Sequence, residues 1–148
     1  MVDSAHLLDL MAEIMDPEIP VVNIVELGIV RGIEDSSPQH IIITPTYVGC
    51  PATDMIGEMI REKLDGAGHG DVGIKNQLSP AWTTDWITDA AHEKLRIYGI
   101  DPPGNHAPTC PRCGSANTKL ISEFGSTPCK ALHSCKDCLE PFDRFKCH

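Results

Sequence analysis

The stretch HIIITPTYVGCPATDM, residues 40–55, joins a strand-forming run to a helix-forming run. Its first half, residues 40–47, is rich in isoleucine and threonine, which favour β-strands. Pro51 suits the first position of a helix, because the N–H that proline lacks has no partner there in any case. Cys50, between Gly49 and Pro51, is therefore predicted to cap the N-terminus of a helix, about 60 residues before the next cysteine.

The elements on either side of this turn predict the fold class. Apolar residues recur at helical spacing within residues 4–15, 51–64 and 88–99, and strand-like runs occupy residues 24–33, 40–47 and 72–78. Gly28 interrupts the first strand-like run, which predicts a β-bulge at this position. The order helix–strand–strand–helix–strand–helix, with a hairpin between the first two strands, predicts an α+β body with a small mixed sheet and three helices.

Composition and charge limit the classes of function. The 148 residues are 41% hydrophobic and 22% charged, they contain no run of 18 apolar residues, and the acidic, amphipathic N-terminus is unlike a signal peptide. We therefore expect a cytoplasmic protein with no membrane partner. Residues 1–105 carry a net charge of −11 and residues 106–148 a net charge of +2, which argues against nucleic-acid binding as the main role.

The change in charge also indicates a domain boundary. It coincides with IDPPGNHAPT, residues 100–109, a stretch of proline, glycine and polar residues that is typical of a linker. We therefore expect a first domain over residues 1–103 and a second domain over residues 104–148.

Six of the seven cysteines lie in the last 39 residues, in a pattern that indicates a metal site. Two C-x-x-C pairs are separated by 21 residues, and this spacing lets two thiolates of each pair face one tetrahedral ion. The pattern predicts a zinc ribbon in which one structural Zn²⁺ binds Cys110, Cys113, Cys135 and Cys138. Exchange of one of these ligands for Cys129 or His133 is the alternative.

Three further ligand-forming residues, Cys129, Cys147 and His148, have two interpretations. They form a second metal site or a transient cluster site, or the cysteines are buried thiols in a domain with few apolar residues. The second interpretation is slightly favoured.

The position of Cys50 has a chemical consequence. Backbone N–H groups at a helix N-terminus point toward the capping side chain, and together with the helix dipole they lower the pKa of a thiol. The alternative is a small buried cysteine that closes the turn. Neither histidine nor lysine stands within several residues of Cys50 as a base, which argues against a Cys–His hydrolase.

Several motifs in the first hundred residues resemble a known family. DPEIPVVNIVELGIVRGI, residues 16–33, precedes TPTYVGCP, residues 44–51, with Thr44 and Thr46 placed before Cys50. These motifs resemble the SufT-type domain of iron–sulfur assembly factors over roughly residues 5–100. SPAWTTDWIT, residues 79–88, and the cysteine-rich tail resemble the PaaD family of accessory proteins of bacterial phenylacetyl-CoA epoxidase systems.

The resemblance implies a non-catalytic maturation factor in phenylacetate degradation. It implies that Cys50 handles iron or an iron–sulfur cluster transiently, for an iron–sulfur reductase or a di-iron oxygenase as client. Asp16 either lies near Cys50 as an oxygen ligand or forms an Asx-turn before Pro17, and the turn is favoured. The rival hypothesis is a scaffold protein that holds oxygenase components together through the ribbon. A homodimer is compatible with either role.

Overall fold

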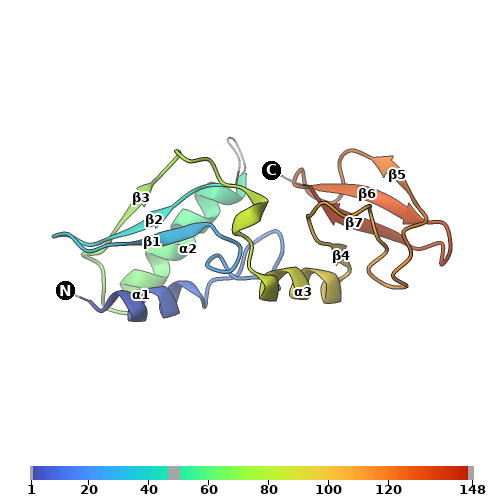
Figure 1. The fold of residues 1–148 in the computed structure, drawn as a ribbon. Helices are drawn as coiled ribbons and strands as arrows, with labels where there is room; N and C mark the ends of the chain where they lie inside the picture. The colour runs from blue at the N-terminus through green and yellow to red at the C-terminus, as the bar shows by residue number, and fades with distance from the viewer. Residues whose placement is uncertain (1, 47–50, 147–148) are drawn as a thin grey trace. The chain divides into compact units, whose positions relative to one another are not determined.

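The computed structural model describes residues 2–46 and 51–146. The chain divides into two compact units, residues 1–88 and residues 89–148, each with a sheet of its own. Figure 1 shows the first unit with its sheet and two helices, and the second with a separate small sheet.

The first unit is built on a three-stranded mixed sheet. Strand β2 (His40–Ile43) is central, antiparallel to β1 (Val30–Glu34) and parallel to β3 (Gly73–Asn76). Helix α1 (Ser4–Met11) precedes the sheet, and α2 (Pro51–Gly66) connects β2 to β3 across one face of the sheet (Figure 1). A short 3₁₀ helix, η1 (Thr84–Trp86), ends the unit.

Apolar spacing explains why the two helices pack against the sheet. Ile56, Ile60 and Leu64, at intervals of four residues, form the buried face of α2, and Leu7 and Met11 do the same in α1. Residues 41 and 43 of β2 are also buried, as the twofold alternation of a strand requires. The core of the unit lies between this sheet and its helices.

The predicted α+β class, with three helices and a small mixed sheet, is confirmed. Pro51 is the first residue of α2, as predicted, whereas α1 ends at Met11 instead of continuing to Met15. The N-cap of α1 is Asp3, whose carboxylate accepts from the N–H of Ala5 at 3.2 Å.

The predicted bulge at Gly28 is wrong, and the structure gives the glycine another role. The irregularity in the β1–β2 pairing lies between Val30 and Gly32, and Gly28 precedes the strand. Gly28 has φ +85°, and a Cβ placed on it would lie 2.7 Å from the Cβ of Trp86. Close packing against η1, together with the left-handed backbone, therefore requires glycine at this position.

The second unit contains one helix and a four-stranded sheet. Helix α3 (Asp89–Tyr98) is followed by β4 (Ile100–Asp101), and the sheet has the order β4-β7-β6-β5. Its other strands are β5 (Thr118–Ser122), β6 (Lys130–Cys135) and β7 (Pro141–Phe145). Strands β5, β6 and β7 form an antiparallel meander, and β4 is parallel to β7.

The two units divide at residue 88, whereas the sequence predicted a domain boundary after residue 103. Only Gly99, with φ +101°, separates α3 from β4, and β4 pairs with β7 of the ribbon sheet. This short connection places α3 with the second unit. As a boundary between independently folding domains, residue 103 stays a prediction.

Among the helices of residues 2–46 and 51–146, none has the length and hydrophobicity needed to cross a membrane.

Gly28→Ala tests the close approach between Gly28 and η1. We expect the substitution to destabilise the first unit by about 2 kcal/mol or more, because it adds a clash to an unfavourable backbone conformation. Urea unfolding followed by tryptophan fluorescence reports on this unit alone, since both tryptophans, Trp82 and Trp86, lie in it.

Gly57→Ala in α2 is the matched control. A Cβ at Gly57 meets no atom within 4 Å, so alanine should leave stability unchanged or raise it by about 0.5–1 kcal/mol. Equal effects of the two substitutions would contradict a specific requirement for glycine at position 28.

Candidate functional site

Two turns of similar geometry present the four cysteines of the paired motifs. In the first, the N–H of Cys110 donates to the carbonyl of Ser115 at 2.9 Å; in the second, the N–H of Cys135 donates to the carbonyl of Glu140 at 2.9 Å. The residue after each second cysteine is left-handed, with φ +76° at Gly114 and φ +65° at Leu139. The two turns are thus equivalent knuckles, although only one carries glycine.

The four sulfur atoms form one compact cluster. All of them lie within 4.8 Å of one another, with 3.7 Å between the Sγ atoms of Cys110 and Cys138 and 3.5 Å between those of Cys113 and Cys135. A tetrahedral Zn²⁺ with Zn–S bonds of about 2.3 Å places its sulfurs about 3.8 Å apart. The arrangement therefore fits Zn²⁺, and none of these four thiols is in a disulfide.

The pKa values of two of the four thiols, Cys135 and Cys138, are shifted in opposite directions. The N–H of Cys138 donates to Cys135 Sγ at 3.4 Å and, helped by the N–H of Asp137, lowers the pKa of Cys135 to about 7. The N–H of Glu140 lowers the pKa of Cys138, but desolvation and the three neighbouring thiols outweigh it and raise this pKa to about 12. Four such groups cannot all ionise side by side without a cation between them.

Polar contacts join the two knuckles outside the cysteines. Asp137 of the second knuckle accepts from the hydroxyl of Ser115 and, at 3.1 Å, from the side-chain amide of Asn117. These hydrogen bonds lower the pKa of the Asp137 carboxyl. The N–H of Lys136 also donates to the carbonyl of Asn117 at 2.8 Å, so hydrogen bonds outside the cluster also join the two knuckles.

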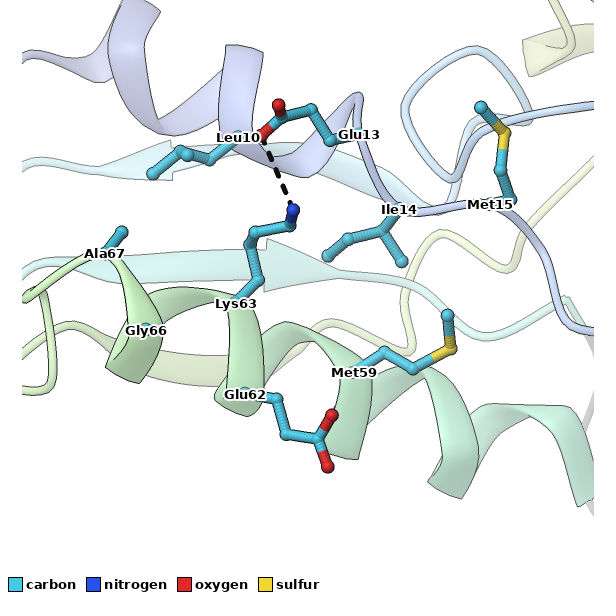
Figure 2. Close-up of a pocket in the computed structure, with 9 residues that line it drawn as sticks. All are labelled: Leu10, Glu13, Ile14, Met15, Met59, Glu62, Lys63, Gly66 and Ala67. Atoms are coloured by element: carbon cyan, nitrogen blue, oxygen red, sulfur yellow. Dashed lines mark ion pairs between the residues drawn. The ribbon is translucent and has the colours of Figure 1, made fainter.

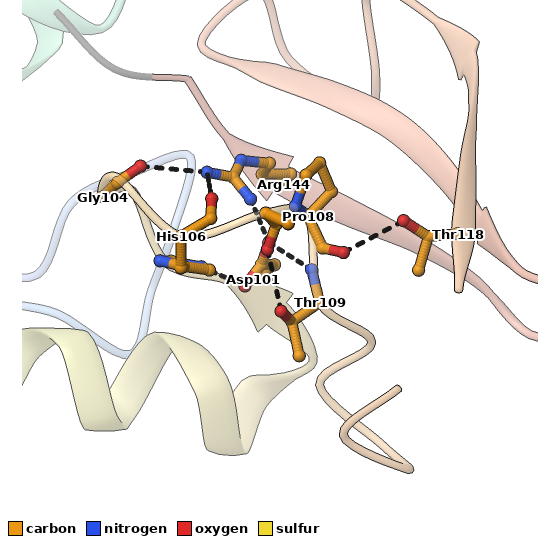
Figure 3. Close-up of polar contacts among 8 residues, drawn as sticks. Asp101, Gly104, His106, Pro108, Thr109, Thr118 and Arg144 are labelled. Atoms are coloured by element: carbon orange, nitrogen blue, oxygen red, sulfur yellow. Dashed lines mark hydrogen bonds and ion pairs between the residues drawn. The ribbon is translucent and has the colours of Figure 1, made fainter. Parts of the chain in front are cut away.

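A buried ion pair fixes the segment that leads into the first knuckle (Figure 3). Asp101, 3% exposed, accepts from Arg144 Nη1 at 2.8 Å and from the N–H of Thr109 at 3.1 Å. His106 Nε2 lies 3.0 Å from the same carboxylate, and Arg144 Nη2 donates to the carbonyls of Gly104 and His106. Residues 100–109, predicted as a linker, are therefore bonded into the ribbon directly before Cys110.

The structure separates the alternative ligands of the ribbon from the four-cysteine cluster. Cys129 is buried outside the cluster, with its Sγ 2.9 Å from the hydroxyl of Thr127. His133 is buried and stacks on Phe142 with ring centroids 5.6 Å apart. Cys147 and His148 lie outside the described residues, so the second metal site stays a prediction.

The first unit presents part of the site predicted around Cys50. Asp16 is buried, and its Oδ1 accepts from the N–H groups of Glu18 at 2.8 Å and Ile19 at 2.9 Å, which is the geometry of an Asx-turn. Thr44 is buried where β2 leads toward the turn, and its hydroxyl has no hydrogen-bond partner among the described residues. Cys50 itself lies outside the described residues, so its distance from Asp16 stays untested.

Sequence reasoning missed two features of this site. The Asp101–Arg144 pair joins residues 43 positions apart, and no local spacing signals such a contact. Leu139 was missed because leucine gives no indication of a left-handed turn. The available signal was the parallel between CPRCG and CKDCL, which predicts equal backbone geometry after both pairs.

Comparison with known families assigns a class to each part of the chain. Residues 4–75 match the family described as iron–sulfur cluster assembly protein, and residues 102–146 match the family described as PaaD zinc beta ribbon domain. The chain therefore combines an iron–sulfur assembly-type domain with a zinc ribbon.

Individual relatives cover different shares of the chain. The chain is 51% identical over 147 residues to a putative 1,2-phenylacetyl-CoA epoxidase subunit of Escherichia coli, covering 93% of this chain and 89% of that protein. It is 33% identical over 86 residues to an Fe-S protein maturation auxiliary factor of Porphyromonas gingivalis, covering 55% of this chain and 80% of the relative. The chain belongs to the PaaD family, which includes this Escherichia coli protein.

A solved structure shows that the fold of the first part occurs elsewhere. The structure of a DUF59 domain from Bacillus anthracis superposes with a TM-score of 0.57 at 23% identity, covering 64% of this chain and 92% of that domain. At this identity the likeness concerns the fold alone.

The four-cysteine cluster predicts a defined metal content. We expect the purified chain to carry one Zn²⁺, Cys135→Ser to lose it, and Cys129→Ser, outside the cluster, to keep it. Because bound thiols must be deprotonated, zinc affinity should fall as the pH is lowered. Elemental analysis and chelator competition at several pH values measure both effects.

Removal of the metal by a chelator should affect the two units differently. We expect it to unfold the ribbon while the tryptophan fluorescence of the first unit stays unchanged. A metal-free chain with a folded ribbon, or a Cys135→Ser variant with full zinc content, would contradict the assignment.

The buried pair next to the first knuckle gives a separate prediction. Asp101→Ala leaves the guanidinium of Arg144 without its carboxylate, and we expect a loss of about 3–5 kcal/mol from the stability of the ribbon. Zinc release to a chelator should accelerate accordingly. Glu123→Ala, which removes an exposed carboxylate from the same unit outside both knuckles, is the control, and equal release rates for both variants would show that the pair does not support the knuckle.

Proposed function

We propose that this chain is a non-catalytic maturation factor that supplies iron or an iron–sulfur cluster to a phenylacetyl-CoA epoxidase system. One observation carries the proposal: an iron–sulfur assembly-type domain and a PaaD zinc ribbon occur in one chain, and the likeness to the Escherichia coli epoxidase protein runs through both. The relatives named as Fe-S maturation factors cover only 55% and 62% of this chain, and in this proposal the ribbon is the portion that adapts the chain to its particular client.

Cys50 is the thiol that handles the iron in this proposal. It directly precedes Pro51, the first residue of a 16-residue helix, and the amide groups and dipole at a helix N-terminus favour a thiolate. A single accessible thiolate can bind iron and release it again, which suits a carrier better than a permanent site. Asp16 shapes the chain after α1 through its Asx-turn, and in this proposal it is a positioning residue for Cys50.

The ribbon has a structural role in the same proposal. Its four thiols at tetrahedral spacing saturate Zn²⁺, so the metal holds the fold together and no position is left for a substrate. Cys129, Cys147 and His148 stay the candidate second metal site, with buried thiols as the slightly favoured alternative. The client is the iron–sulfur reductase or the di-iron oxygenase component, and we place the protein in the cytoplasm.

A scaffold role is the second candidate, and a specific feature of the ribbon favours it. Strand β5 is at the edge of its sheet, and Leu120, Ile121 and the nearby Phe124 are 50–68% exposed. Exposed apolar side chains at a sheet edge are typical of protein contacts. A scaffold would need this surface but not the thiol of Cys50, so Cys50 distinguishes the two roles.

Cys50→Ser tests the maturation role. The variant and the wild type are each co-produced with the epoxidase components and purified without oxygen, and the iron and sulfide contents of those components are measured. We expect Cys50→Ser to keep its zinc and its fold but to lower the iron content of the client by at least about tenfold, as expected when an iron-handling group is lost.

Ala52→Ser is the matched control, because it changes the same turn and leaves the thiol in place. It should give a fully loaded client. A client that is equally loaded with Cys50→Ser would overturn the maturation role, and co-purification of the components with that variant would then support the scaffold.

A further inference from the structure

An open groove of about 700 Å³ lies between α1 and α2 of the first unit (Figure 2). The residues around it come from the end of α1 with the segment that follows, and from the second half of α2 with Ala67. They are Leu10, Glu13, Ile14, Met15, Met59, Glu62, Lys63, Gly66 and Ala67.

The floor and walls of the groove are apolar and adaptable. Ile14 is buried, Met59 is partly exposed, and Met15 is 39% exposed. Methionine side chains are flexible and polarisable, and they line surfaces that adjust to the shape of a partner. Gly66 closes α2 without a side chain, and a Cβ built there meets no atom within 4 Å, so this end of the groove is open.

The apolar surface continues along α2 beyond the groove. Met55, one turn before Met59, is 51% exposed on the same side of the helix. Met55, Met59 and Gly66 therefore follow one line along a helix that is about 24 Å long. A surface of this length matches several turns of another helix better than it matches a small molecule.

Charge around the groove is negative. Glu62 is exposed at the edge, and Glu13 pairs with Lys63 at 3.5 Å across the groove, where the carboxylate side chain is 60% exposed (Figure 2). In the first unit as a whole, residues 1–88, 14 acidic and 4 basic side chains give a net charge of −10. An occupant with positive charge beside its apolar surface is therefore favoured over a neutral or acidic one.

We propose that this groove receives an amphipathic helix of a partner protein, with an apolar stripe flanked by lysine or arginine. A partner helix packs along α2 through ridge-and-groove contacts, and an apolar stripe at i, i+3, i+4 and i+7 fills the groove between α2 and the segment that follows α1. Basic residues beside the stripe pair with the exposed carboxylate of Glu62, and they share the 60% exposed carboxylate of Glu13 with Lys63.

The inference goes beyond the proposed function, because recognition of the helix requires no iron chemistry. It also suggests how a client could be positioned relative to Cys50 in the proposed function. The exposed line along α2 runs toward Pro51, and Cys50 is one peptide bond before this residue. A partner bound along α2 is thereby brought to the helix end that Cys50 precedes in the sequence.

The test uses the full-length chain, with its methionines labelled with ¹³C at the methyl group, and a synthetic probe. The chain has five methionines, at positions 1, 11, 15, 55 and 59, so each methyl signal can be assigned by substitution. The probe is a peptide of about 18 residues, five helical turns, with leucine along one stripe and lysine on both flanks. A peptide of the same composition with scattered leucines, and one with glutamate in place of lysine, are the control probes.

We expect the striped basic peptide to shift the Met15 and Met59 signals and to leave buried Met11 unchanged. Glu62→Lys should weaken binding by about tenfold, the effect of 1.4 kcal/mol of lost attraction. Asp85→Lys, which reverses an exposed carboxylate of the same unit that does not line the groove, is its matched control and should weaken binding less than about twofold.

Gly66→Gln tests the contribution of the groove's shape to peptide binding independently of its charge. It adds a side chain at the open end of the groove without a change in net charge, and it should also weaken binding by about tenfold. The variant should keep its fold, since glutamine forms helices better than glycine.

Three results would overturn the proposal. Equal binding of the striped and scattered peptides would show attraction by charge alone, and equal effects of Glu62→Lys and Asp85→Lys would place the contact elsewhere. A dimer that forms with increasing concentration, shifts the Met15 and Met59 signals without peptide and is abolished by Gly66→Gln would assign the groove to a second copy of this chain.

Discussion

The ribbon depends on one electrostatic constraint: four closely spaced cysteine thiolates repel one another unless a cation lies between them. Cys110, Cys113, Cys135 and Cys138 come within 4.8 Å of one another, and only a cation at their centre allows all of them to be thiolates. The ribbon has a small core of its own, formed where Phe142 packs against Cys110 and Cys135. Its strands are therefore best regarded as a frame that holds two knuckles in the positions that a tetrahedral ion requires.

The frame extends beyond the cysteines. The carboxylate of Asp101 gathers the guanidinium of Arg144 and the backbone of Thr109, and so fixes the approach to Cys110 from the preceding segment. Asp137 joins the second knuckle to the first. These contacts reduce the number of conformations that the metal must select, which lowers the entropic cost of forming the site.

The first unit follows a different principle, because an apolar core holds it together and its charge is on the surface. Its buried helical faces pack on a three-stranded sheet, while the exposed methionines and carboxylates beside α2 are left available for a partner. The proposed iron-handling thiol directly precedes α2 in the chain, and the proposed helix groove runs beside α2. A carrier benefits from this arrangement, since recognition of a client and release of its cargo then occur along one rigid element.

Local chemistry made several features predictable from the sequence. Spacing within each C-x-x-C pair is a local property of the chain, so the four-cysteine cluster was predictable from residue type and interval. Pro51 was predictable as the start of α2, because proline lacks the N–H that an interior helical position requires. The α+β class followed from periodicity, which depends on which residues share a face and not on where the chain goes afterwards.

Tertiary structure alone decided the features that join distant residues. Gly28 is required by the close approach of Trp86, which is 58 positions away, and not by a bulge in its own strand. Residues 100–109 have the composition of a linker, yet Arg144 captures Asp101 and makes them part of the ribbon. The groove beside α2 likewise exists only because α1 ends at Met11 and the chain turns along the neighbouring helix. The sequence shows which residues stand at these positions, but their roles depend on partners that only folding brings within contact distance.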